Sequence, residues 1–409
     1  MVTLNWNVLP AEMKYSVVEL LNAKDTAAFA KASREAYHMS VPTMFADIKL
    51  NTFDALRSFV LNVPAAHCRY VRTLQVELST PGLSATQISG HLHELLSRCV
   101  RVEELSLKLA GSLKPTVIPC FERLHYLTKL SITNVAQEET SPLSERLAVS
   151  IAASIPNLAD LTLDRITRSA IHAPELLGAY PFIPIVLGDD DVPAHRYLGS
   201  RLSLPSLLQI PSLRALRVRD THLGDPEWSR ATPRCRLDTL ELGSSCYESA
   251  DHNRTYAECI LAHTGRSLQH LTLGSPVIDV PTLKHLRTLR VASVFPLEHL
   301  YDTLCALAAA PVADLAIECH EDDAEDMCDV LEDFLSQCVE RHGEGFFTRL
   351  LDVSLCTLSD ELAHAVPACA SKIHHTPSAG GAAAAIQRMQ DFVRDVRSNQ
   401  KNATMQASR

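Results

Sequence analysis

A short leucine motif, apolar-x-x-Leu-x-apolar, recurs ten times in this sequence and constrains its fold more than any other feature. Within each copy, apolar and polar side chains alternate, which predicts a short strand with one buried face. Such a strand buries that face by stacking on its neighbours, so the copies together predict an array of repeats. They begin at Val71, Val102, Leu127, Leu158, Leu213, Leu237, Leu268, Leu286, Val312 and, as a weaker match with Val353 in place of the leucine, Leu350.

The segments between the motifs predict return helices, because their apolar residues recur at helical spacing. The interval between Leu161 and Leu216 is about two repeat lengths, which predicts one degenerate or inserted unit. Its proline-rich part, 174–211, contains the run Asp189 to Asp191, which we expect to lie in an exposed loop. The three clearest helical faces hold Ile88, Leu92, Leu95, Leu96 and Cys99; Leu297, Leu300, Tyr301, Leu304 and Leu307; and Met327, Val330, Leu331, Phe334 and Leu335.

Between about residues 48 and 360 the chain resembles a leucine-rich repeat protein. That resemblance implies an α/β solenoid, an irregular arc with a largely parallel sheet inside and helices outside. The chain lacks the Asn or Cys that such repeats carry eight residues after each motif start, so we expect the buried side-chain ladder to be lost. An ordinary α/β sheet is the alternative, but it favours glycine-rich turns between strand and helix, and glycine is scarce here.

The N-terminal segment predicts three short helices ahead of the repeats. Pro10 suits the first position of a helix, Asp25 suits the N-cap of a second, and Val41-Pro42 restarts the chain into a third. Three helices in about 40 residues cannot bury all their apolar surface alone. Some of that surface must therefore face the repeats or a partner.

This segment resembles an F-box. The residues that carry the resemblance are Leu9-Pro10-x-Glu12, Leu20-Leu21, Asp25, the Ala-x-x-Ser-Arg stretch from Ala30 to Arg34, and Phe45-x-x-Ile48. With Arg69 to Arg72 leading into a leucine-rich strand, the whole resembles fungal F-box proteins with divergent repeats. The family tryptophan near the end of the third helix is absent, and Phe45 lies about there. A helical cap that only seals the repeats is the alternative. The predicted adaptor-binding face is Leu9, Pro10, Met13, Val17 and Leu21.

Composition and missing motifs exclude several function classes. The 48 acidic and 38 basic residues give a net charge of −10, which disfavours general binding to nucleic acid or to a membrane surface. The first charged side chain is Glu12, so no signal peptide is expected. Twelve cysteines without a CxxC pair are typical of reduced thiols and an intracellular protein, cytoplasmic or nuclear. No phosphate-binding loop, nucleophile elbow or metal-ligand spacing occurs, which predicts no enzyme, no cofactor and no metal.

Two functions remain open. In the first, the resemblance implies a substrate receptor of an SCF-type ubiquitin ligase, with an F-box domain at 1–47 and target-binding repeats at 48–365. In the second, the chain is a repeat scaffold without a ligase. A partly helical or disordered tail is expected at 366–409. The outward positions of the motifs carry both charges, and Arg217, Arg219 and Arg290 are the candidate residues for binding an acidic or phosphorylated target. The alternative is that these arginines are surface charges that balance Glu241 and neighbouring acids.

Overall fold

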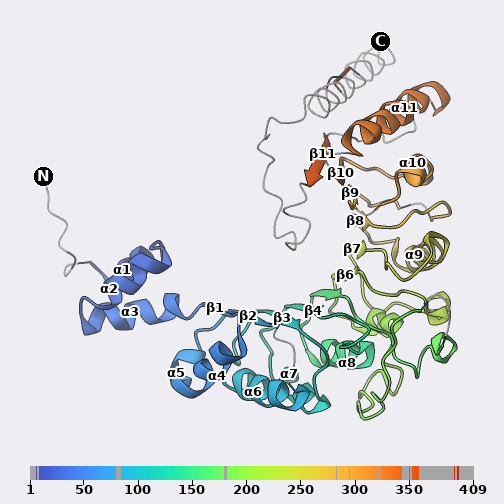
Figure 1. Cartoon of the computed structure of the whole chain (residues 1–409). Coiled ribbons are helices and arrows are strands. Elements are labelled where there is room, and N and C mark those ends of the chain that lie inside the picture. The colour runs from blue at the N-terminus through green and yellow to red at the C-terminus, as the bar shows by residue number, and fades with distance from the viewer. Residues whose placement is uncertain are drawn as a thin grey trace, which may run out of the picture. The chain divides into compact units, whose positions relative to one another are not determined.

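The computed structural model describes residues 6, 9–79, 84–178, 182–281, 283–293, 295–320, 323–342, 350, 352–358, 391 and 394–395 (Figure 1). The chain forms two compact units, Met1–Ser212 and Leu213–Arg409. Most of the predicted tail, 366–409, lies outside the described residues. No helix in the described part of the chain is long and apolar enough to cross a membrane.

Each unit contains parallel strands that follow one another in chain order. In the first unit the paired strands are β1 (Asp47–Leu50), β2 (Thr73–Leu78), β3 (Glu104–Leu109), β4 (Lys129–Asn134) and β5 (Asp160–Asp164). In the second they are β6 (Ala215–Arg219), β7 (Thr239–Leu242), β8 (His270–Leu273), β9 (Thr288–Val291), β10 (Asp314–His320) and β11 (Asp352–Leu358). All ten motifs therefore form strands, as the sequence predicts, and the α/β class with a parallel sheet is confirmed.

The register of the strands follows the central leucine of each motif. In the first unit Leu74, Leu105, Leu130 and Leu161 are paired in one row across the sheet. The corresponding row of the second unit is Leu216, Leu240, Leu271, Leu289, Leu315 and Val353. All of these side chains are buried, and burial of each contributes about 1.5–3 kcal/mol. These rows of apolar side chains form the core of each unit.

The return segments are more varied than the sequence predicts. In the first unit, helices lie along one side of the strands (Figure 1): α4 (Phe53–Asn62), α5 (Ala65–Cys68), α6 (Ala85–Arg98), the short η2 (Pro115–Val117) with α7 (Ile118–Phe121), and α8 (Glu145–Ser154). In the second they are η5 (Pro226–Arg230), α9 (Ala250–Thr264), η6 (Leu297–His299) with α10 (Leu300–Leu307), and α11 (Ala324–His342). The predicted faces on α6, on α10 and on α11 as far as Phe334 are largely buried. The side chain of Leu335 lies outside the part that the structure describes. Between β8 and β9 the described residues contain no helix.

The N-terminal segment forms three helices, but two of their starts differ from the prediction. They are α1 (Ala11–Glu19), α2 (Ala23–Ala30) and α3 (Arg34–Met44). The cap of α2 is Asn22, whose side chain accepts a hydrogen bond from the backbone of Asp25. Ser33 caps α3 in the same way. Pro42 does not start a helix but lies near the end of α3.

The segment between β5 and β6 is an insertion and contains no degenerate strand in its described residues. It comprises η3 (Pro174–Leu176), η4 (Leu204–Gln209), and loops that pair with the rest of the unit through isolated bridges. One of these bridges joins Ser144 to Thr167, and another joins Ser169 to Val186. The loops are therefore attached to the start of α8 through the backbone.

One asparagine caps loop amides where the sequence predicts that the side-chain ladder is lost. Asn134, fully buried at the end of β4, accepts hydrogen bonds from the backbone N–H groups of Gly111 (3.3 Å) and Ala136 (3.1 Å). Its side-chain amide donates to the carbonyl of Ser141 (2.9 Å). Because Asn134 lies one residue before the expected position, the motif alignment misses it.

Replacing Asn134 with alanine should therefore lower the free energy of unfolding by about 1–3 kcal/mol, because buried backbone groups lose their partner. Urea unfolding of the full chain measures this change. Asn51→Ala, at an exposed position, is the matched control and should change stability by less than about 0.5 kcal/mol. Equal effects of the two substitutions would show that Asn134 has no capping role.

Candidate interaction surfaces

The predicted adaptor-binding residues lie together on α1 and at its two ends. Met13 and Val17 are 54% and 42% exposed, and Pro10 is also exposed. Leu9 and Leu21 are half-buried. Leu20, which was not among the candidates, is the most exposed large apolar residue of the described chain at 87%. This end of the protein therefore presents an apolar surface to solvent.

An adjacent side of α1 holds that surface in place. Val18 is buried, and the Lys14 ammonium lies 2.9 Å from a carboxylate oxygen of Glu35 on α3. The same ammonium lies 5.9 Å from the centre of the Trp6 ring, whose edge contacts Phe29 on α2. These contacts fix α1 against α3 and fix Trp6, just ahead of α1, against α2. The exposed side chains therefore lie on a packed helix.

The three candidate arginines lie on the second unit's strands, and each is paired with a glutamate. Arg219 makes two contacts with Glu241 of β7, at 2.5 and 2.9 Å. Arg217 Nε lies 3.8 Å from the same carboxylate. Arg290 of β9 pairs with Glu318 of β10. In the structure these guanidinium groups are therefore already paired with carboxylates of the same chain.

The outward face of the first unit shows the same pairing of charges between neighbouring strands. Lys108 of β3 lies 3.5 Å from Glu77 of β2, and Lys129 of β4 lies 2.7 Å from Glu104 of β3. These groups are a third to a half exposed, so each pair contributes only about 0–1 kcal/mol. The outward face is thus of mixed charge, with its acids and bases arranged in pairs.

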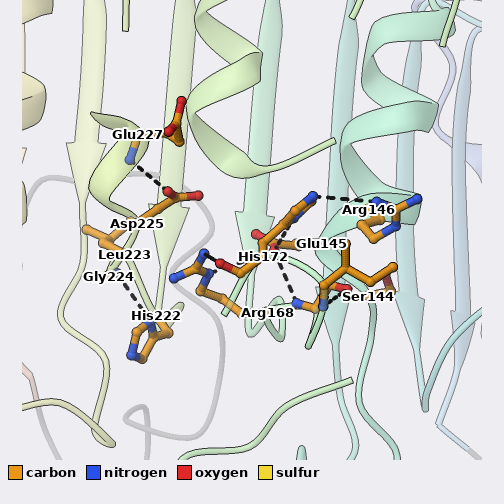
Figure 2. A network of polar contacts seen from close by, with 12 residues as sticks. Ser144, Glu145, Arg146, Arg168, His172, His222, Leu223, Gly224, Asp225 and Glu227 are labelled. Atoms are coloured by element: carbon orange, nitrogen blue, oxygen red, sulfur yellow. Dashed lines mark hydrogen bonds and ion pairs between the residues drawn. The ribbon is translucent and has the colours of Figure 1, made fainter. Parts of the chain in front are cut away.

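A buried ion-pair cluster joins α8 to the insertion, and the sequence analysis did not find it (Figure 2). The side chains of Glu145 and Arg168 are fully buried, with a carboxylate oxygen 3.8 Å from the guanidinium Nε. The same carboxylate oxygen lies 2.8 Å from His172 Nδ1 and accepts a hydrogen bond from the backbone N–H of Ser169 at 3.1 Å. Arg168 also donates to the carbonyl of His172. Both charges are therefore compensated inside the protein.

Asp189 belongs to a second part of this cluster, which corrects the prediction of an exposed aspartate run. Its carboxylate accepts hydrogen bonds from the hydroxyls of Ser144 (2.6 Å) and Ser169 (2.7 Å). Arg146 on α8 donates to the carbonyls of Asp189, Val192 and Ser200. Asp190 and Asp191 are exposed, as predicted. The insertion is thus anchored to α8 by polar contacts at several points.

One pair of side chains has the geometry of a cysteine–histidine catalytic dyad. Cys120 Sγ lies 3.1 Å from His93 Nδ1, on neighbouring helices. Burial raises the pKa of the Cys120 thiol above its ordinary value, so at neutral pH the sulfur carries its proton and is a poor nucleophile. The described residues also contain no group of three or more His, Cys, Asp and Glu side chains that could hold a metal ion.

No protein-family model matches the chain, and no curated protein matches it. Among solved structures, it is similar to the leucine-rich repeat-containing protein LegL7 from Legionella pneumophila. The two share 14% sequence identity with a TM-score of 0.36, and the match covers 78% of this chain and 94% of that one. At that distance the likeness carries no argument about function. The description of stacked repeats rests on the strand register and the buried leucine rows of this chain itself.

Proposed function

We propose that this chain is a protein-interaction subunit in which α1–α3 dock an SCF adaptor and the repeats hold a protein to be ubiquitinated. The observation that carries the proposal is the exposed apolar surface on α1, a helix that is otherwise fixed by packing. The resemblance of the same residues to an F-box supports it and suggests the adaptor as the partner. On this proposal the docking domain is 1–47 and the target-binding part is 48–365.

The exposed side chains of α1 are well suited to drive docking. Met13 and Leu20 leave more than half of their surface in water, and Val17 leaves 42%. Fully burying an exposed side chain of this kind contributes about 1.5–3 kcal/mol, so each of these contributes up to that amount in proportion to its exposed part. A few such anchors near the centre of an interface carry most of its binding energy. Because α1 is already packed against its neighbours, little ordering would be needed on binding.

The arginines on β6 could bind an acidic target by exchanging one carboxylate for another. Arg217 and Arg219 are about a quarter to a third exposed, and both contact the single carboxylate of Glu241. A carboxylate or phosphate of the target would compete with Glu241 for the two guanidinium groups. This competition predicts that Glu241 weakens target binding while it holds the arginines in position.

Reversing Arg217 and Arg219 to glutamate should abolish retention of acidic and phosphorylated peptides by the full chain, while adaptor capture is unchanged. Glu241→Gln should instead strengthen peptide retention severalfold, because it removes the competing charge and keeps the side-chain size. A peptide array and adaptor capture measure the two properties separately. If the double reversal leaves peptide retention unaltered, these arginines do not bind the target.

The second function, a repeat scaffold without a ligase, predicts the same target surface but no adaptor complex. The experiment that separates the two is therefore mixing the full chain with purified SCF adaptor protein. The ligase proposal expects a stable complex on size-exclusion chromatography. Two separate peaks at micromolar concentrations would favour the scaffold.

A further inference from the structure

A hollow of about 720 Å³ lies in the second unit, outside the rows of leucine strands. One wall comes from the segment 229–237, which follows η5 and leads into β7. The other wall comes from the last turn of α9 and the residues after it, 262–267. The volume is within the usual range of about 300–1,000 Å³ for sites that bind small ligands.

The walls of this hollow are held by buried contacts. Trp228 of η5 is buried, and its indole N–H donates to the carbonyl of Leu223 at 2.8 Å. The hydroxyl of Ser267 donates to the carbonyl of Leu237 at 2.6 Å, which joins one wall to the other. At Gly265 a side chain would meet Leu283, since an added Cβ would lie 2.5 Å from its methyl group. The hollow is thus preformed.

The lining of the hollow is positively charged. It includes Arg230, Arg236, Arg266 and His263, and no acidic residue among the described residues lines it. Arg230 is paired with Glu227 at 3.1 Å. Arg236 and Arg266 make no side-chain hydrogen bond or ion pair with any residue that the structure describes. They differ in this from Arg219, whose guanidinium is held by Glu241.

The end of α9 opposes this charge only in part. The carboxyl end of a helix carries roughly half a negative charge, and α9 ends at this hollow. Two unpaired guanidinium groups carry two full positive charges, so the local field still attracts anions. The chain as a whole is acidic, with a net charge of −10. A local group of arginines without acidic neighbours in the lining therefore differs from the average charge of the protein.

We propose that this hollow binds phosphate groups, with Arg236 and Arg266 as the principal ligands. The planar guanidinium fork grips a phosphate through two parallel N–H donors. The room between the walls fits a ligand with more than one phosphate, such as a small polyphosphate or a phosphorylated peptide. This site is separate from the arginines of β6 and does not depend on the proposed ligase function.

The test is isothermal titration of the full chain with two probes, inorganic tripolyphosphate and a peptide carrying two phosphoserines. The wild-type chain should bind at least one of them, with an affinity that falls as salt rises. Arg236→Ala combined with Arg266→Ala should lower that affinity at least tenfold. The matched control is Arg254→Ala on α9, whose guanidinium pairs with Asp251 at 2.8 Å; it should leave the affinity unchanged.

The two probes distinguish the source of the phosphate, since binding of tripolyphosphate alone indicates a small-molecule site and binding of the peptide alone indicates a protein ligand. Either result, with the loss in the double variant, supports the proposal. Binding of neither probe would overturn it, and so would equal affinity of the wild type and the double variant. Circular dichroism checks that the double variant is folded, as expected for substitutions at exposed positions.

Discussion

Replacing Glu145 with alanine should lower the free energy of unfolding by about 3–5 kcal/mol, because breaking a buried ion pair leaves an uncompensated charge. Glu145 and Arg168 are both fully buried, so water cannot replace the lost carboxylate. The substitution also removes the acceptor for the Ser169 backbone and the partner of His172. We therefore expect the insertion to open from α8 first.

Urea unfolding of the full chain measures the overall loss, and hydrogen exchange locates it. In Glu145→Ala, exchange should quicken most between residues 165 and 200, where the backbone bridges anchor the insertion. Glu94→Ala, at an exposed position of α6, is the control and should have an effect below about 0.5 kcal/mol. Equal stability of the two variants would mean that the cluster contributes little to the fold.

Introducing two charges on α1, Met13→Glu with Val17→Glu, should abolish adaptor capture, with a loss of at least about a hundredfold in affinity. Burying unpaired carboxylates in an apolar interface costs several kcal/mol, and each 1.4 kcal/mol is a factor of about ten. Both side chains are exposed in the protein, so stability should change little.

The control for this variant is Lys114→Glu, which changes the net charge by the same amount at an exposed position of the first unit. Its affinity for the adaptor should equal that of the wild type. If both variants lose affinity for the adaptor equally, the loss comes from long-range electrostatics and not from the α1 surface. Unchanged binding of the α1 variant would place the adaptor site elsewhere.

The strands could be predicted because their signal is local and repeated. Each motif carries its own alternation, and aligning the central leucines already gives the register that pairs Leu74 with Leu105. The same alignment places Arg217 and Glu241 at one motif position, and they are direct partners in the sheet. The alternative that these arginines balance Glu241 therefore has a basis in the sequence. The diagonal contacts of Arg219 and Arg290 with their glutamates come from the structure.

The buried cluster could not be predicted in this way. Glu145, Arg168 and Asp189 lie on three segments that are distant in sequence and follow no period, and only the folded chain brings them to Ser169. The predictions of where α2 and α3 begin were wrong for a different reason. Asn22 and Asp25 are both good caps, and a proline two residues before a helix end looks locally like a helix start.

The central claim is that the N-terminal helices dock an SCF adaptor, and the most direct measurement is isothermal titration of the wild-type full chain with that adaptor. The account predicts saturable binding with equal amounts of the two proteins in the complex, and its loss in the Met13→Glu, Val17→Glu variant. If circular dichroism shows that the wild-type chain is folded and the titration shows no binding, the adaptor proposal is contradicted.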